Sequence, residues 1–260
     1  MASSSHTAPA FVRLAGHPLR WQLLAELTRS DLRVRELVTL VGQSQNLVSY
    51  HVRLLLDAGL ITATRSSFDG RDTYYHLDLD RCAYELAGAG AALHPALRPD
   101  STTPAPPDAP RRPSPTVMFV CTGNSARSPI AEALLRQHTA GHVTAVSAGT
   151  HPKSQLHPHT VRVLQDHFGV DVADQRPRHL ETFTGHRFDY VITLCDKARE
   201  VCLGFGDRPR LAHWSVPDPT AASGNDQDSY PAFVRTAADI GTRVRHLLPV
   251  LANDSKEVES

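Results

Sequence analysis

Apolar residues recur every three or four positions in three stretches near the start of the chain, over residues 19–27, 34–41 and 44–58. This spacing predicts three helices with one apolar face each. Ser44 stands where the N-cap of the third helix is expected, and Gly59 stands near its end. Because Gly42 allows a tight connection, the second and third helices have the form of a helix-turn-helix.

A hairpin is predicted directly after these helices. The sequence LITATRSSFDGRDTYYHLDL alternates between apolar and polar residues around Asp69 and Gly70, which favour a turn. Residues 10–87 are therefore expected to form a mainly helical domain with a β wing, a winged helix-turn-helix.

The second half of the chain alternates short apolar runs with helical patterns. The runs lie at 117–120, 143–148, 190–194 and 211–214, and the helical patterns lie at 129–139, 157–168 and 230–251. This order predicts an α/β domain over residues 116–253, with a four-stranded parallel sheet covered on both faces. Eight prolines fall among the 21 residues from Pro95 to Pro115, so residues 88–115 are interpreted as an extended linker.

Composition restricts the function classes. Lys plus Arg equals Asp plus Glu at 27 each, so no overall charge favours nucleic acid or a membrane surface. The chain has no run of 18 apolar residues and no signal-peptide core near Met1, so we expect a cytoplasmic protein without membrane partners. Four cysteines in 260 residues are too few for a disulfide framework and are more typical of catalysis or metal binding.

The most informative chemistry lies between the run 117–120 and the next helical pattern. Cys121 and Arg127 are separated by five residues at a strand-to-helix turn, which suits a tetrahedral oxyanion: loop amides, the helix N-terminus and a guanidinium can all face it. The same positive field favours the thiolate form of Cys121. The residues expected to complete the oxyanion loop are Thr122, Gly123, Asn124, Ser125, Ala126 and Ser128.

The segment VMFVCTGNSARSPIAEALLR resembles the low-molecular-weight tyrosine phosphatase fold, a group that includes the thioredoxin-coupled arsenate reductases. The resemblance covers about residues 116–250. It implies that Asp218, in HWSVPDPT, is the general acid that protonates a leaving oxygen. These parts serve a phosphatase and an arsenate reductase equally well.

Two further cysteines separate these enzymes. Cys195 and Cys202, in VITLCDKAREVC, resemble the redox relay of the thioredoxin-coupled reductases. The resemblance implies an arsenate reductase in which Cys121, Cys195 and Cys202 exchange disulfides in turn, with thioredoxin or a similar dithiol as reductant. It also makes a potassium ion possible near Asn124, Glu132 and Ser147, and no other cofactor is expected. The alternatives are a low-molecular-weight protein tyrosine phosphatase and a regulator whose second half only senses anions.

The segment GQSQNLVSYHVRLLLDAGLI resembles the winged helix of the arsenical-resistance repressors, the ArsR/SmtB family, over about residues 10–87. The resemblance implies operator DNA as a partner and a homodimer formed through this domain. Nine arginines balance nine acidic residues from Phe11 to Gly90, which leaves a protein-interaction module as the alternative. The residues expected to meet DNA are Gln45, Asn46, Ser49, Tyr50 and Arg53 on the helix and Arg65 and Arg71 on the wing.

One departure from that family concerns its sensing site. Arg33 and Arg35 stand where arsenite-sensing members carry two cysteines. Because thiolates bind soft ions and guanidinium groups do not, a soft-metal sensor is not expected here. The two arginines could instead receive an oxyanion.

Overall fold

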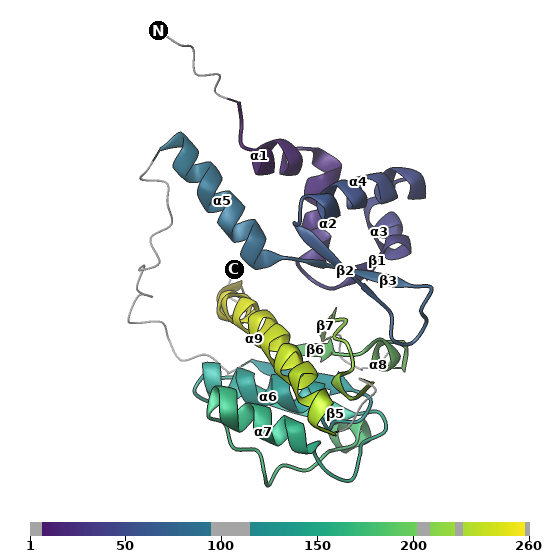
Figure 1. The fold of residues 1–260 in the computed structure, drawn as a ribbon, viewed down its shortest axis with the longest axis vertical. Coiled ribbons are helices and arrows are strands. Elements are labelled where there is room, and N and C mark those ends of the chain that lie inside the picture. The colour runs from purple at the N-terminus through teal and green to yellow at the C-terminus, as the bar shows by residue number, and fades with distance from the viewer. Residues whose placement is uncertain (1–6, 95–114, 202–208, 222–225, 258–260) are drawn as a thin grey trace. The chain divides into compact units, whose positions relative to one another are not determined.

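The computed structural model describes residues 7–94, 115–201, 209–221 and 226–257, which divide into two compact units (Figure 1). Within these residues, no helix is both long enough and apolar enough to cross a lipid bilayer.

The N-terminal unit is a winged helix. Its elements are α1 (Ala10–Ala15), α2 (Pro18–Leu27), β1 (Leu32–Arg33), α3 (Val34–Val41), α4 (Gln45–Asp57), β2 (Ile61–Arg65), β3 (Thr73–Leu77) and α5 (Leu79–Leu93). The three predicted helices are confirmed as α2, α3 and α4, and their apolar faces meet in one core around Leu23, Leu37 and Leu55.

Local sequence explains the turns of this unit. Gly42 takes the left-handed conformation, with φ of 64°, where α3 ends. Ser44 is the N-cap of α4 as predicted, although its side chain makes no capping hydrogen bond. The wing is confirmed as an antiparallel pair of β2 and β3, but their register pairs Arg65 with Thr73. The two strands are therefore connected by a loop of residues 66–72 and not by a two-residue turn at Asp69 and Gly70. The hydroxyl of Ser66 accepts the amides of Phe68 and Asp69 and so shapes this loop.

The helix α5 extends into the stretch interpreted as linker. Asp78 begins it by accepting the amide of Arg81 at 2.8 Å, and the alanine-rich sequence that follows continues the helix to Leu93. Residues 95–114, the proline-rich part, lie outside the described residues.

The C-terminal unit has the predicted four-stranded parallel sheet. Its strands are β4 (Thr116–Cys121), β5 (Thr144–Gly149), β6 (Tyr190–Thr193) and β7 (Arg210–His213), in the order β5-β4-β6-β7. The helices are α6 (Arg127–His138), α7 (Pro158–Phe168), α8 (Asp196–Val201) and α9 (Asp226–Glu257), with short 3-10 turns at Leu180–Phe183 and Pro219–Ala221.

The central strands β4 and β6 position the site. Consecutive residues of both strands are buried, so the sheet is covered on both of its faces there. Because the two strands are parallel neighbours, their carboxyl ends meet at one edge, where the amide of Leu194 donates to the carbonyl of Val120 at 2.7 Å. Ligands of such sheets bind at this edge.

Candidate active site

Cys121 is the last residue of β4, and the loop 122–126 leads from it directly into α6. Its thiol is buried and lies 3.0 Å from the hydroxyl of Ser128, on the first turn of the helix. The backbone amide of Asn124 donates to the sulfur at 3.2 Å. The loop therefore curls around the sulfur and presents donors to it, as the sequence predicts for an oxyanion loop.

The segment after β5 holds the loop from outside. Four of its amides donate to loop carbonyls: Thr150 to Cys121 (3.2 Å), His151 to Thr122 (2.8 Å), Lys153 to Gly123 (2.9 Å) and His157 to Ser125 (2.9 Å). Because these bonds engage the carbonyl side of the loop, we expect its amide side to serve an anion in the pocket.

Asn124 fixes the shape of the loop. Its backbone is in the left-handed region, with φ of 45°, which asparagine tolerates better than most residues. Its side-chain amide donates to the hydroxyls of Ser128 (2.9 Å) and Ser147 (2.8 Å), and its carbonyl oxygen accepts the amide of Arg178 at 2.7 Å. Gly149 is required beside it, since a Cβ there would lie 2.7 Å from the carbonyl oxygen of Thr122.

Glu132 is a buried carboxylate beneath this network. It accepts hydrogen bonds from Ser147 (2.5 Å) and Gln175 (2.8 Å) and forms ion pairs with Arg178 (2.8 Å) and Arg136 (2.7 Å). A potassium ion needs oxygen ligands with free lone pairs, whereas here N–H donors and guanidinium charge already engage the carboxylate. The residues expected near a potassium ion therefore do not fit one, and within the described residues no group of three His, Cys, Asp or Glu could hold a metal ion.

Arg127 and Asp218 meet at the opposite wall. The guanidinium of Arg127 is buried and bonds the carboxylate of Asp218 at 2.8 Å and the carbonyl of Val216 at 3.1 Å. Its Nε atom is buried and has no hydrogen-bond partner among the described residues. The other oxygen of Asp218 accepts the amide (3.0 Å) and the hydroxyl (2.8 Å) of Thr220, which holds this half-exposed carboxyl group over the loop.

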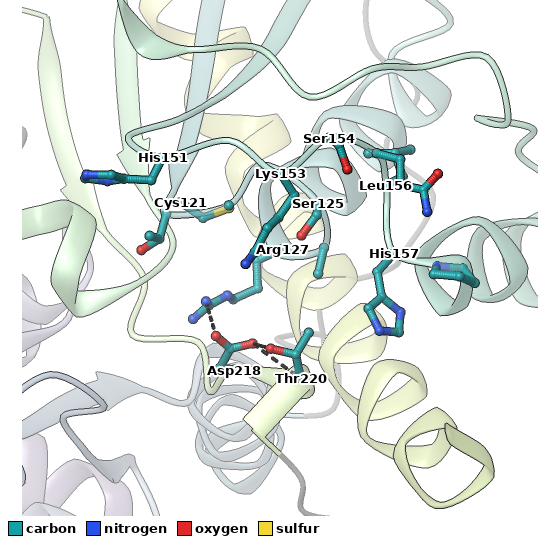
Figure 2. Close-up of a pocket in the computed structure, with 15 residues that line it drawn as sticks. Cys121, Ser125, Arg127, His151, Lys153, Ser154, Leu156, His157, Asp218 and Thr220 are labelled. Carbon is teal, nitrogen blue, oxygen red and sulfur yellow. Dashed lines mark hydrogen bonds and ion pairs between the residues drawn. The ribbon is translucent and has the colours of Figure 1, made fainter. Parts of the chain in front are cut away.

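These residues surround a pocket of about 540 Å³. Figure 2 shows Cys121, Arg127 and Asp218 around it and the Lys153 side chain directed toward the loop. The remaining wall is formed by the segment after β5 and the start of α7, and it includes His151, Leu156, His157 and Pro158. The pocket thus combines an anion site at Cys121 with a wider mouth of mixed polarity.

Cys195 lies beside the loop on the neighbouring strand end. Its thiol is 3.3 Å from the hydroxyl of Thr122 and accepts the amide of Ala198 at 3.4 Å. Burial raises the pKa of this thiol. The positive charge of Arg127 lowers the pKa and offsets part of this effect. The two sequence-predicted thiols that the structure describes in this unit therefore flank one threonine.

Of the other two cysteines, the structure describes Cys82 and not Cys202. Cys202 lies outside the described residues. Cys82 belongs to the N-terminal unit, where burial, with Asp78 and Glu85 nearby, raises its pKa to about 11. Such a thiol is almost entirely protonated near neutral pH and is a poor nucleophile.

The family of the C-terminal unit follows from its sequence as a whole. Residues 116–258, more than half of the chain, match the model of the low molecular weight phosphotyrosine protein phosphatases. The chain belongs to this family. The loop at Cys121, Arg127 and Asp218 thus lie within a low molecular weight phosphatase domain.

Relatives within this family include arsenate reductases. The chain is 32% identical to the arsenate reductase of Bacillus licheniformis over 130 residues, which are 50% of this chain and 92% of that protein. It is 30% identical to the arsenate reductase of Bacillus subtilis over 129 residues, 50% of this chain and 91% of that one. A solved arsenate reductase in its phosphate-binding state is 26% identical and covers 53% of this chain and 98% of its own, with a TM-score of 0.42.

The N-terminal unit matches a second family model. Residues 17–72 match the MarR family of winged-helix regulators, whereas the motif resembles the arsenical-resistance-repressor type. On helix α4 the side chain of Ser49 is half-buried, and the exposed side chains are Gln45, Asn46, Tyr50 and Arg53. On the wing, Arg65 and Arg71 are exposed. All the side chains expected to meet DNA are thus at least partly accessible.

Arg33 and Arg35 are engaged within this unit. Both guanidinium groups bond Asp72, at 2.8 and 3.0 Å, and Arg33 also bonds Glu36 at 3.0 Å. These contacts connect the start of α3 to the start of the wing strand. Since two carboxylates already neutralise the arginines, the geometry does not favour an oxyanion there.

Sequence reasoning missed several residues of the site. Gly149 ends an apolar strand, and a glycine at that place is a signal of close backbone approach that could have been read. Lys153 lies in a segment without periodicity, and Arg178 and Gln175 bond Glu132 from 46 and 43 residues further along the chain. Nothing local in the sequence indicates those long-range contacts.

Proposed function

We propose that the C-terminal domain is an arsenate reductase that works through Cys121, Cys195 and Cys202 in turn, and that it acts in arsenic resistance. The observation that carries the proposal is the second thiol at the loop: Cys195 lies 3.3 Å from Thr122, the residue after Cys121. Ester hydrolysis needs one thiol, an arginine and an acid, whereas reduction needs a further thiol within reach. The arsenate reductases among the relatives support the same reading.

The chemistry begins on arsenate held by the loop amides and Arg127. The Cys121 thiolate attacks arsenic, and a hydroxyl group leaves as water with a proton from Asp218. Cys195 then gives up its proton and attacks the sulfur of Cys121. A disulfide forms as the sulfur–arsenic bond breaks, and its electron pair leaves with arsenic, which departs as arsenite.

Two thiol–disulfide exchanges restore the enzyme. Cys202 attacks Cys195, which frees Cys121 and leaves a disulfide between Cys195 and Cys202. Thioredoxin or a similar dithiol reduces that disulfide and is itself oxidised. Each cycle thus converts one arsenate to arsenite for one external dithiol.

The second candidate function is a protein tyrosine phosphatase, and the lining of the pocket favours it. Beyond the loop the pocket is lined by Leu156, His157 and Pro158, which offer contacts to an organic group. Arsenate and phosphate share their shape and charge, so we expect weak ester hydrolysis from the same loop.

For the N-terminal unit we propose operator binding through α4 and the wing by a homodimer of the arsenical-resistance-repressor type. Apolar side chains exposed on α1 and α5 would be buried between two copies; they are Val12, Tyr84, Leu86 and Leu93. Two copies would also present α4 and Arg53 twice, which offsets the balanced charge of one domain.

A coupled assay tests the proposed enzyme. Purified full-length protein is supplied with arsenate, thioredoxin, thioredoxin reductase and NADPH, and arsenite is measured together with NADPH consumption. We expect many arsenite molecules per enzyme, and a kcat/KM for arsenate well above that for p-nitrophenyl phosphate. Hydrolysis of the ester with no arsenite formed would favour the phosphatase instead.

A further inference from the structure

A buried polar cluster lies next to Cys195, and the proposed chemistry does not use it. Asp196, the first residue of α8, accepts hydrogen bonds from His213 (3.0 Å) and Ser215 (2.8 Å) on one carboxylate oxygen. His213 ends β7, and Ser215 follows it two residues later. A cluster of this kind costs desolvation energy, so each member needs partners to be tolerated in the interior.

His213 holds the chain on both sides of Cys195. Its Nδ1 atom lies 2.9 Å from the hydroxyl and 3.2 Å from the carbonyl oxygen of Thr193, two residues before the cysteine. Its Nε2 atom contacts Asp196, one residue after the cysteine. One imidazole thus fixes both flanks of the peptide that carries this thiol.

The charge of Asp196 strengthens these contacts. Burial alone would raise the pKa of the carboxyl group, but its hydrogen bonds, of which the one from His213 has the largest effect, together hold the pKa below its ordinary value. Asp196 is therefore ionised near neutral pH, and charge-assisted hydrogen bonds are roughly twice as strong as neutral ones.

We propose that Asp196 is a positioning residue for the sulfur relay: through His213 and Ser215 it holds the Cys195 thiol at the loop, in line for attack on Cys121. This inference rests on the proposed reductase function. Disulfide exchange requires the attacking sulfur to approach along a defined line, and a displacement of about 1 Å can cost on the order of 10²-fold in rate.

Ester hydrolysis should not depend on this cluster. The part of the acid segment that carries Asp218 has its own support, since Arg127 bonds the carbonyl of Val216 and the carboxylate of Asp218. Loss of the Asp196 carboxylate should therefore slow the step at Cys195 and leave attack by Cys121 and protonation by Asp218 in place.

The test compares Asp196→Ala and Asp196→Asn with the full-length wild type, and Lys197→Ala on the same helix is the matched control. For Asp196→Ala we expect kcat for arsenate to fall on the order of 10²-fold, with KM for arsenate and kcat for p-nitrophenyl phosphate within about threefold of wild type. Asp196→Asn keeps the volume and an acceptor oxygen, so its loss should be roughly tenfold. Lys197 is exposed, and its variant should keep both activities.

Each other outcome has a distinct meaning. Equal losses of both activities, or a rise in KM for arsenate without a fall in kcat, would overturn the positioning role, as would wild-type reduction by both Asp196 variants. If thermal melting shows that Asp196→Ala does not fold, the same comparison of kcat for arsenate and for p-nitrophenyl phosphate is made with Asp196→Asn. A wild type that forms no arsenite would instead overturn the proposed function itself, and the positioning role with it.

Discussion

A Cys121→Ser variant should lose arsenate reduction and ester hydrolysis together, each by at least about 10⁴-fold. The reason is that both reactions begin with attack by the same sulfur, which accepts the amide of Asn124 and contacts the hydroxyl of Ser128. A serine hydroxyl is a far weaker nucleophile than a thiolate. Steady-state assays with arsenate and with p-nitrophenyl phosphate measure the two losses.

The matched control is Cys82→Ser. Cys82 lies in the N-terminal unit, and its pKa of about 11 leaves it protonated near neutral pH. We expect this variant to retain both activities. If Cys121→Ser kept measurable turnover of either substrate above the uncatalysed rate, attack by Cys121 could not be the common first step.

A Cys195→Ser variant should separate the two reactions. Arsenite formation should fall by roughly 10³-fold or more, because no second sulfur is left to attack Cys121, while ester hydrolysis should stay within about threefold. Arsenate should still react with Cys121, so the protein should carry labile arsenic. Arsenite is measured by speciation after a rapid quench, and undiminished release from this variant would remove Cys195 from the mechanism.

The sequence predicts much of the fold because its strands and most helices bury continuous or periodic apolar faces. The four runs from 117–120 to 211–214 all became strands of one parallel sheet. The helix α5 escaped prediction, since the stretch LAGAGAAL mixes alanine with glycine and has no clear apolar period. The wing turn differed because the Ser66 hydroxyl, and not the Asp69–Gly70 pair alone, organises the loop.

The sequence predicts those site residues that lie close together along the chain, and it does not predict those that only the fold brings together. Cys121, Arg127 and Ser128 lie within eight residues, so spacing alone indicates an oxyanion loop. The support of that loop comes from Glu132, Arg178 and the amides of the segment after β5, which only the folded sheet brings together. The residues expected near a potassium ion show the same limit: the sequence places their oxygen atoms but not the arginines that pair with Glu132.

The N-terminal unit illustrates a related limit. Helix periodicity and the hairpin are common to all winged helices, so they predict the fold without selecting the family, and the match is to MarR proteins. The subtype depends on a few side chains. Among these, Arg33 and Arg35 stand where a sensing site is found in arsenite-sensing repressors. Both form ion pairs with Asp72, so they connect helix α3 to the wing.

The central claim is that three thiols act in series, and arsenite release by Cys202→Ser tests it most directly. The variant and the wild type are mixed with excess arsenate, thioredoxin, thioredoxin reductase and NADPH, and arsenite is counted per enzyme molecule. Because Cys121 and Cys195 are buried, a disulfide between them should resist thioredoxin. The wild type should turn over many times, and Cys202→Ser should release one arsenite per molecule and stop. Continued turnover by the variant at the wild-type rate would contradict the relay.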